Sequence, residues 1–352
     1  MKKLMATIIG IIVAIGAMMA QSSQLATLSH EGLIRTFYGA DALKNAHEIA
    51  EDGDVITLSS GSFNAVTITK AITLRGVGVG KDSSNNALPT IINSFLSIQV
   101  PANENLHFTM EGISTAAGIS CLDASNPLFL KCRIGGNFNV YRTNNITIMH
   151  CMVSANAAFN SSTAGTIINS IFHAIDSMYN FTCTNSVIYN LHLSTYKNST
   201  TTYTIKNTNI YNSIFIPTMS DFSGANANAK ALHSSNMADN CVAGCLYHNG
   251  SPQNPFRLLP DYSSDTCLKD DALKAIFAAS ANTFSGCEST LFQLSETGKQ
   301  YKGNDGKEVG AYGGNMPFDL RTTTPQITKC NVAAKSTVDG KLSVDIEVSE
   351  IE

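Results

Sequence analysis

The sequence predicts an all-β protein, a single-stranded right-handed parallel β-helix (a solenoid) with an N-terminal capping helix and a C-terminal β-hairpin. Short apolar runs alternate with Gly, Asn and Asp turns over most of the 352 residues. Only 14% of the residues are charged and there is no Trp, while Ser, Thr and Asn are abundant. This composition suits strands and turns better than helices. A short pattern centred on a small residue recurs six times, which indicates stacked coils.

The N-terminus has the features of a secretory signal peptide. Lys2 and Lys3 precede an apolar run at 8–19, and Ala20 fits a cleavage site. The run is shorter than the about 20 residues that a membrane helix needs. We therefore expect an exported protein with no membrane span after cleavage. The periplasm, the outer surface and the medium remain alternatives, as does an uncleaved anchor.

A capping helix is expected directly before the first strands. Asp41 can begin this helix and Gly53 can end it. Its predicted apolar face consists of Leu43, Ala46, Ile49 and Ala50. Strands are predicted at 55–58, 66–68 and 72–74, with a turn at Gly61. A helix here would cover the open end of the solenoid, where apolar surface and unpaired strand edges are otherwise exposed.

The central repeat aligns on one small residue per copy. The six positions are Cys132, Cys151, Ser170, Ser186, Ser213 and Cys241, with steps of 19, 19, 16, 27 and 28 residues. If each step is one coil, equivalent residues stack about 4.8 Å apart. The small side chains would then fill a tight inward corner, and the neighbouring Asn side chains would bond their own turn or a stacked Asn. The longer steps predict projecting loops at 193–204 and 217–238. A β-sandwich with coincidental Asn-Ser pairs is the alternative.

The C-terminal part contains three further patterns. Apolar spacing at 270–279 predicts a second short helix, and 305–314 is rich in turn residues. Alternating residues on both sides of Asp339-Gly340 predict a hairpin. The expected organisation is a signal peptide at 1–20, a lead-in at 21–38, the β-helix at 39–320 and the hairpin extension at 321–352.

Nine Cys residues in an exported chain allow disulfides, and the odd number leaves at least one unpaired. Most of them lie in apolar, strand-like runs, so we expect buried packing residues. Cys241 and Cys245 are four residues apart, but no matching His/Cys pair follows them. A zinc site is therefore only weakly indicated.

Two stretches carry a family resemblance. The helix, Gly53–Leu58 and Ile72–Gly76 resemble the N-terminal cap and first coil of pectin-lyase-like right-handed β-helix proteins. The stretch Asp305–Gly314, with Pro317-Phe318 after it, is similar to the end of exported β-helix proteins of Bacteroides-type bacteria, which often carry a C-terminal hairpin. The resemblance implies the fold. It does not imply one activity, because the superfamily includes lyases, hydrolases and adhesins.

The resemblance also implies what an enzyme of this fold would need. Such hydrolases use several carboxylates, and pectate-type lyases use acidic residues that hold calcium together with an Arg or Lys base. Between residues 112 and 220 the only carboxylates are Asp123 and Asp176, and Asn207-Thr208-Asn209 carries an amide in place of the hydrolase acid. Standard pectinolytic catalysis is therefore not expected. No cofactor is expected either; calcium is possible, but no motif supports it.

The candidate binding residues are Arg142, His150, His173, Asp176, His192, Tyr196 and Tyr203. The three His residues are spaced by 23 and 19 residues, so on successive coils they could share one outer face with Asp176 and Arg142. Tyr rings could offer stacking surfaces for sugars. Scattered solvent-facing His residues are the alternative.

These observations favour recognition of a polysaccharide or of a cell-surface glycan, without standard pectinolytic catalysis. The net charge of −4 and the lack of a basic block give no support to nucleic-acid binding. A monomer is expected. Two alternatives stay open: a polysaccharide lyase or glycoside hydrolase with a non-standard site, and a structural or adhesive surface protein.

Overall fold

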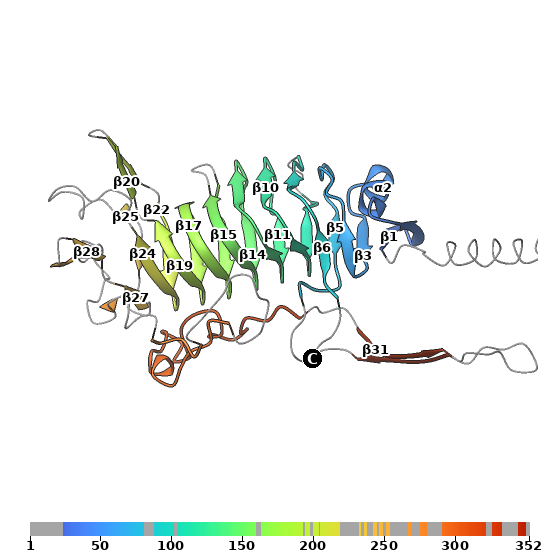
Figure 1. The fold of residues 1–352 in the computed structure, drawn as a ribbon. Coiled ribbons are helices and arrows are strands. Elements are labelled where there is room, and N and C mark those ends of the chain that lie inside the picture. The colour runs from blue at the N-terminus through green and yellow to red at the C-terminus, as the bar shows by residue number, and fades with distance from the viewer. Residues whose placement is uncertain are drawn as a thin grey trace, which may run out of the picture.

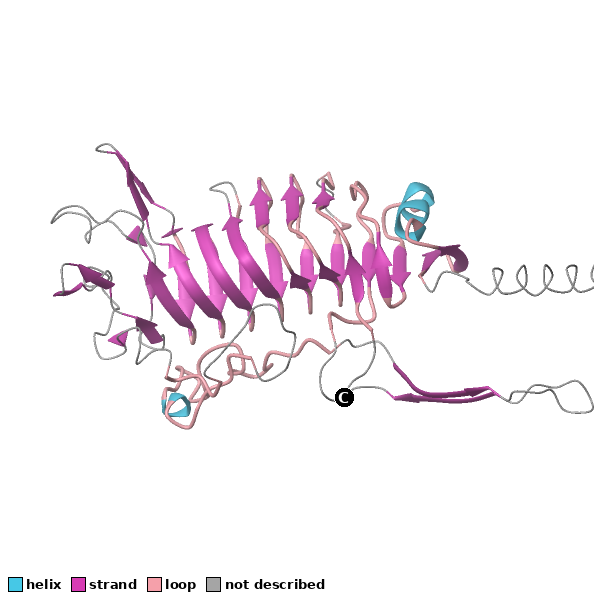
Figure 2. Ribbon diagram, viewed as in Figure 1, coloured by secondary structure: helices cyan, strands magenta, loops and turns pink. Residues whose placement is uncertain are grey.

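The computed structural model describes residues 24–80, 88–101, 105–159, 163–192, 194–197, 200–203, 205–218, 232–233, 236–237, 242–244, 246–248, 251–253, 267–268, 275–279, 291–321, 326–332 and 344–349. Their strands stack side by side along one axis and form an elongated parallel β-solenoid (Figure 1). Figure 2 shows that helix is confined to the end near the N-terminus and to one short turn. The predicted signal peptide at 1–20 lies outside the described residues.

One sheet contains a strand from each coil. Its order is β2 (Leu33–Tyr38), β1 (Leu25–His30), β3 (Val55–Leu58), β5 (Thr73–Arg75), β8 (Thr109–Glu111), β11 (Leu128–Leu130), β14 (Ile146–Met149), β16 (Gly165–Ile168), β18 (Phe181–Thr184), β23 (Asn209–Tyr211) and β26 (Asn236–Met237). From β3 onward every pair is parallel, which requires a full coil between neighbouring strands.

A second sheet runs beside the first. Its order is β4 (Gly61–Phe63), β6 (Thr90–Ile92), β9 (Ser114–Thr115), β12 (Arg133–Ile134), β15 (Met152–Phe159), β17 (Ile171–Tyr179), β19 (Val187–His192), β24 (Ile214–Thr218), β27 (Val242–Gly244) and β30 (Cys267–Leu268). A branch forms a third face from β7 (Leu96–Ile98), β10 (Ile119–Leu122), β13 (Phe138–Tyr141), the far ends of β15 and β17, β22 (Ile205–Lys206) and β25 (Leu232–His233). Each central coil therefore crosses three faces.

Strand pairing confirms the spacing of the repeat. The residue that follows each small residue pairs with its counterpart on the next coil: Arg133, Met152, Ile171, Val187, Ile214 and Val242. The predicted steps are therefore the coil lengths. The sandwich alternative is wrong, because a sandwich is built from antiparallel strands.

The small residues fill a buried inward corner, as their spacing predicts, and three of them also form a hydrogen-bonded ladder that was not predicted. Ser170, Ser186 and Ser213 are fully buried. The Ser186 hydroxyl accepts from the backbone N–H of Ser170 at 3.2 Å, and the Ser213 hydroxyl accepts from the N–H of Ser186 at 3.1 Å. Each hydroxyl also donates to the carbonyl two residues before it. The small side chain thus satisfies backbone groups that the tight corner leaves unpaired.

The residue before each of the five described small residues has a positive φ. These residues are Lys131, His150, Asn169, Asn185 and Asn212. Asn adopts this left-handed conformation at low cost, which explains the repeated Asn-Ser pairs. The predicted stacked Asn contacts occur at other corners, where Asn207 donates to Asn180 and Asn93 donates to Asn64.

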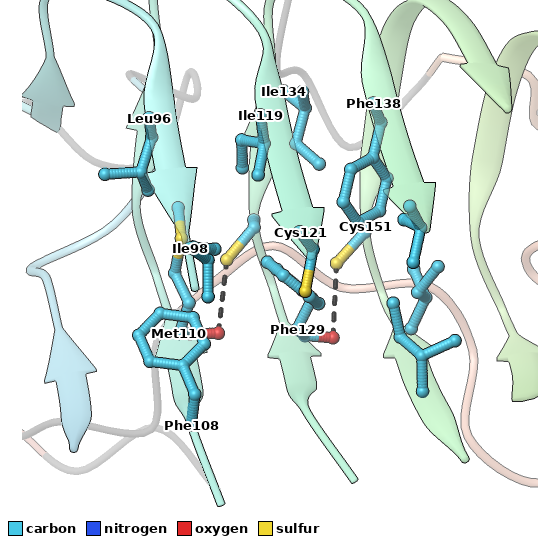
Figure 3. Close-up of a cluster of buried hydrophobic side chains, with 14 of the residues drawn as sticks. Leu96, Ile98, Phe108, Met110, Ile119, Cys121, Phe129, Ile134, Phe138 and Cys151 are labelled. Carbon is cyan, nitrogen blue, oxygen red and sulfur yellow. Dashed lines mark hydrogen bonds between the residues drawn. The ribbon is translucent and has the colours of Figure 1, made fainter. Parts of the chain in front are cut away.

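The interior of the solenoid is apolar. Phe108, Phe129, Phe138 and Phe159 meet edge to face, with ring centroids 5.0–6.1 Å apart. Figure 3 shows the Cys151 thiol, which donates to the carbonyl of Phe129 at 3.4 Å.

The side chains of four cysteines are described, and none of these four forms a disulfide. Cys121, Cys132, Cys151 and Cys183 are free and buried, which confirms the packing role for these four. Burial raises the pKa of Cys121 to about 12, so this thiol stays protonated and inert. The other five cysteines lie outside the residues whose side chains are described.

Helix α2 (Ala42–Ile49) covers the end of the solenoid as predicted (Figure 1). Two details of the prediction are wrong. The Asp41 side chain accepts from Asn64 and does not cap the helix. Ile49 is 44% exposed, and His47 is buried in its place, where it accepts from the N–H of Thr69. No helix in the described part is long and apolar enough to cross a membrane.

The lead-in segment contributes strands that the sequence analysis did not assign. β1 pairs antiparallel with both β2 and β3 and so extends the first sheet beyond the first coil. The strand predicted at 66–68 is reduced to a single bridge between Ile68 and Ile98, and Gly61 begins β4.

Three further pairs of strands are antiparallel: β20 (Ser194–Lys197) with β21 (Thr200–Tyr203), β28 (Leu246–His248) with β29 (Ser251–Gln253), and β31 (Gln326–Val332) with β32 (Val344–Ser349). The last pair occupies the predicted C-terminal hairpin, whose turn at Asp339-Gly340 lies outside the described residues. The helix predicted at 270–279 is absent from its described part. Residues 275–279 form a turn and a bridge from Phe277 to Leu294.

Candidate functional site

Residues 291–321, here named the strap, run back along the solenoid beside the corners that carry the ladder. The strap contains a short 3-10 turn, η3 (Gly298–Gln300), and is otherwise loop (Figure 2). Its contacts proceed in reverse order: residues 303–304 meet Asn212, residues 311–314 meet Asn185 and Asn169, and Arg321 meets Lys131. The turn-rich 305–314 segment is therefore part of the strap that packs against the solenoid.

The left-handed Asn corners hold the strap. The Asn169 amide donates to the carbonyls of Ala311 and Gly313 at 2.8 and 2.9 Å. The Asn212 side chain accepts from the N–H of Asn304 and donates to its side chain. A Cβ at Gly314 would lie 3.0 Å from three atoms of the Asn185 side chain, so glycine is required for this approach. The amides of Asn169 and Asn212 therefore bind another segment of the chain, whereas the Asn185 side chain packs against Gly314 and its buried amide nitrogen has no hydrogen-bond partner among the described residues.

The strap also covers an outward-facing apolar row. Met152, Ile171, Val187 and Ile214 follow the small residues and point away from the main core, and each is at most 1% exposed. They join a second apolar cluster with strap residues that include Phe292, Val309 and Phe318. Sequence reasoning missed this cover. The available signal was the pair of apolar residues after Cys151, Ser170, Ser186 and Ser213, since neighbouring strand residues face opposite sides.

His150 belongs to this contact and not to an outer binding face. It occupies a left-handed corner, is 6% exposed and accepts from the backbone N–H of Asp319 at 3.0 Å. Its ring stacks on Phe318 with centroids 6.4 Å apart. Burial lowers the pKa of His150; Lys131 lowers it further and Asp319 opposes this. The neutral imidazole thus accepts a hydrogen bond that fastens the strap.

The outer side of β17 and β19 gathers two of the candidate residues with new neighbours. His173 stacks on Tyr189, with centroids 6.5 Å apart and an angle of 18° between the rings. The Asn190 amide donates to the carbonyl of His173, and the Asn156 amide donates to Asp176 at 3.0 Å. These five residues, all half-buried, are here named the β17 face.

Two irregularities in strand pairing shape the β17 face. Between Val153 and Asn156 the strand β15 has one residue more than β17, and near Ala157 the strand β17 has one more than β15. Asp176 is that extra residue, because Ile175 pairs with Ala157 and Ser177 pairs with Ala158. Such bulges re-aim side chains and often occur beside binding sites.

The expected row of three His residues is wrong. On the next coil the position equivalent to His150 is Asn169. His173 therefore lies four residues beyond that position. One coil after His173 the chain reaches Tyr189. His192 ends β19, one residue beyond the pair formed by Ile175 and Leu191, and so lies next to Asp176 in register. Irregular coil lengths place the three His residues at three different positions of the coil.

The other candidate residues lie elsewhere. Arg142 occupies a left-handed corner after β13 and forms an exposed ion pair with Asp123, with 2.6 Å between Nε and Oδ1. Its guanidinium holds the pKa of Asp123 below its usual value. Tyr196 and Tyr203 lie in β20 and β21, and their side chains are outside the described part.

The two acids that the central coils carry between residues 112 and 220 are far apart. Asp123 follows β10 and Asp176 lies in β17, three strands further along the third face. At about 4.8 Å per strand this separation is roughly 14 Å. Glycosidase pairs lie at most about 9.5 Å apart. In the described segments no three His, Cys, Asp or Glu side chains come together as a metal site would require.

Comparison with known proteins does not assign this chain to a family. No family model, curated protein or solved structure matches this chain. The fold and the side-chain geometry are therefore the basis for any functional conclusion.

Proposed function

We propose that this chain is an exported, right-handed β-helix protein of the pectin-lyase-like type that recognises a polysaccharide or a surface glycan without standard pectinolytic catalysis. The observation that carries the proposal is the β17 face. It combines a stacked imidazole and phenol with a carboxylate and two amides on neighbouring strands. The solenoid and the strap would provide a rigid support for this face.

The chemistry of the β17 face suits a sugar. Sugar hydroxyls both donate and accept hydrogen bonds, and Asp176, Asn156 and Asn190 offer a carboxylate and two amides within three adjacent strands. His173 and Tyr189 add ring surface beside the strap, where Tyr189 also meets Phe292 edge to face with centroids 6.2 Å apart. The apolar side of a pyranose can stack on the exposed part of such rings. Parallel strands repeat about every 4.8 Å, so successive polar groups can follow an extended chain.

The same residues argue against acid–base hydrolysis by two carboxylates. Asp176 is bonded to the Asn156 amide, and Asp123 is paired with Arg142 about three strands away. A hydrolase of this kind needs an acid and a second carboxylate that flank the same glycosidic bond. The proposed role is therefore recognition.

A polysaccharide panel tests the proposal. The exported protein would be incubated with plant, microbial and host polysaccharides, with and without calcium, and scored for retention, new reducing ends and unsaturated products. Retention without product supports recognition. Product that disappears in His173→Ala would contradict the proposal and support the enzyme alternative. A folded sample that neither binds nor cleaves any polymer would favour the adhesive or structural alternative.

A further inference from the structure

The first sheet ends in an exposed apolar edge strand. β2 is the terminal strand, and within the described part of the chain its outer edge pairs with no other strand. Leu33, Ile34 and Tyr38 are 65%, 72% and 57% exposed, although β-branched and aromatic residues usually lie on covered strands. Natural sheets normally protect such an edge with charges, a proline or a bulge. Here Arg35 is the single charged residue of the strand.

The hydrogen-bond pattern identifies which backbone groups of β2 point outward. The backbone N–H of Gly39 donates to the carbonyl of Gln24. In an antiparallel pair every second pair of opposite residues is hydrogen-bonded, so in β2 the residues that bond β1 are Leu33, Arg35 and Phe37. The N–H and C=O groups of Ile34, Thr36 and Tyr38 therefore point away from β1. They form a regular row of donors and acceptors for one more antiparallel strand.

We propose that this edge pairs with the same strand of a second copy, giving an end-to-end dimer about a two-fold axis at Thr36. Only Ile34, Thr36 and Tyr38 have backbone N–H and C=O groups that point outward. In the dimer these three residues must therefore lie opposite the same three residues of the second copy. The centred register places Thr36 opposite Thr36 and Ile34 opposite Tyr38 of the second copy, a favourable β-branched–aromatic pair.

Charge selects this register over its nearest neighbour. In the centred register Arg35 faces Phe37 of the second copy, where a guanidinium can stack on the ring. A shift by one step, which keeps the same outward groups, places Arg35 opposite Arg35. Like charges directly opposite each other destabilise a sheet. A shift by one step in the other direction places Phe37 opposite Phe37 and pairs only two of the three outward residues, whereas the centred register pairs all three. The centred register is therefore the most complementary one, and a second copy is the occupant that fits it. The proposed dimer differs from the monomer that the sequence analysis expects.

Pairing of two six-residue strands predicts a weak dimer, with a dissociation constant on the order of micromolar. Sedimentation velocity of the exported protein, from about 1 to 300 µM, would show a shift from monomer to dimer. Thr36→Pro removes two central hydrogen bonds without disturbing those to β1, because this N–H points outward. It should raise the dissociation constant at least about tenfold.

Cross-linking tests the register independently of folding. In the centred register the two Thr36 Cα atoms lie about 5.5 Å apart, within the range of a disulfide. Thr36→Cys should therefore form a covalent dimer on oxidation. Arg35→Cys is the matched control, because its two copies lie diagonally, beyond about 7 Å. Three results would each overturn the proposal: a monomer at every concentration, a dimer unaffected by Thr36→Pro, or no more covalent dimer from Thr36→Cys than from Arg35→Cys.

Discussion

Replacement of one ladder serine measures what the small-residue corner contributes to stability. In Ser186→Ala the buried N–H of Ser170 loses its acceptor. The carbonyl of Thr184 keeps a partner, because it also accepts from the N–H of Asn169. The change thus leaves one buried donor unpaired, which costs about 1–3 kcal/mol. We expect the free energy of unfolding to fall by about 2 kcal/mol.

A second substitution at the same site separates hydrogen bonding from packing. Cys132 and Cys151 occupy the same ladder position on earlier coils, so Ser186→Cys fits the corner and retains a weak acceptor. It should cost less than Ser186→Ala. Urea unfolding followed by circular dichroism would measure both, with Thr166→Ala, on the outer side of β16, as a control within about 0.5 kcal/mol of the wild type. A loss below about 0.5 kcal/mol in Ser186→Ala, or a larger loss in Ser186→Cys, would refute the reasoning.

The strap gives three further predictions. Because burial lowers the pKa of His150, its stabilising effect is complete above the ordinary value of 6.5 and is lost as the pH falls below it. The protection factor of the Asp319 amide in hydrogen exchange should therefore fall in acid, and His150→Asn should remove this dependence. Phe318→Ala should weaken strap docking by about 3 kcal/mol. Limited proteolysis should then cut the strap of the variant faster than that of the wild type, while the solenoid stays intact. Cutting at the wild-type rate would contradict this prediction. Gly310→Ala places a Cβ 2.8 Å from Ile214 at a positive φ, so thermal melting should occur several degrees lower.

The coil architecture could be predicted from the sequence because it depends on local patterns. The Asn-Ser pairs report a corner that needs a left-handed residue followed by a small one, and these requirements recur in the five described coils from Cys132 to Ser213. The irregular steps did not hide the repeat, since loops vary in length without changing the strand register.

The strap and the true neighbours of the His residues could not be predicted in the same way. Asn169 contacts Ala311, which lies 142 residues further along the chain, and no periodic pattern reports such a contact. The spacing of the His residues seemed regular only because coil length was taken as constant. The step from Ile171 to Val187 is 16 residues and the step from Val187 to Ile214 is 27, so equal spacing does not give one face. Neither bulge beside Asp176 leaves a local sequence signal.

Affinity electrophoresis tests the central claim most directly. Gels would contain the polysaccharide that retains the wild-type protein most strongly, and would compare Asp176→Asn with Asp123→Asn. Both variants lose one carboxylate charge, but only Asp176 belongs to the β17 face. The proposed function predicts that Asp176→Asn lowers the apparent affinity at least about tenfold, while Asp123→Asn is retarded by the polymer, relative to a gel without polymer, as strongly as the wild type. Equal retardation of the two variants would contradict it.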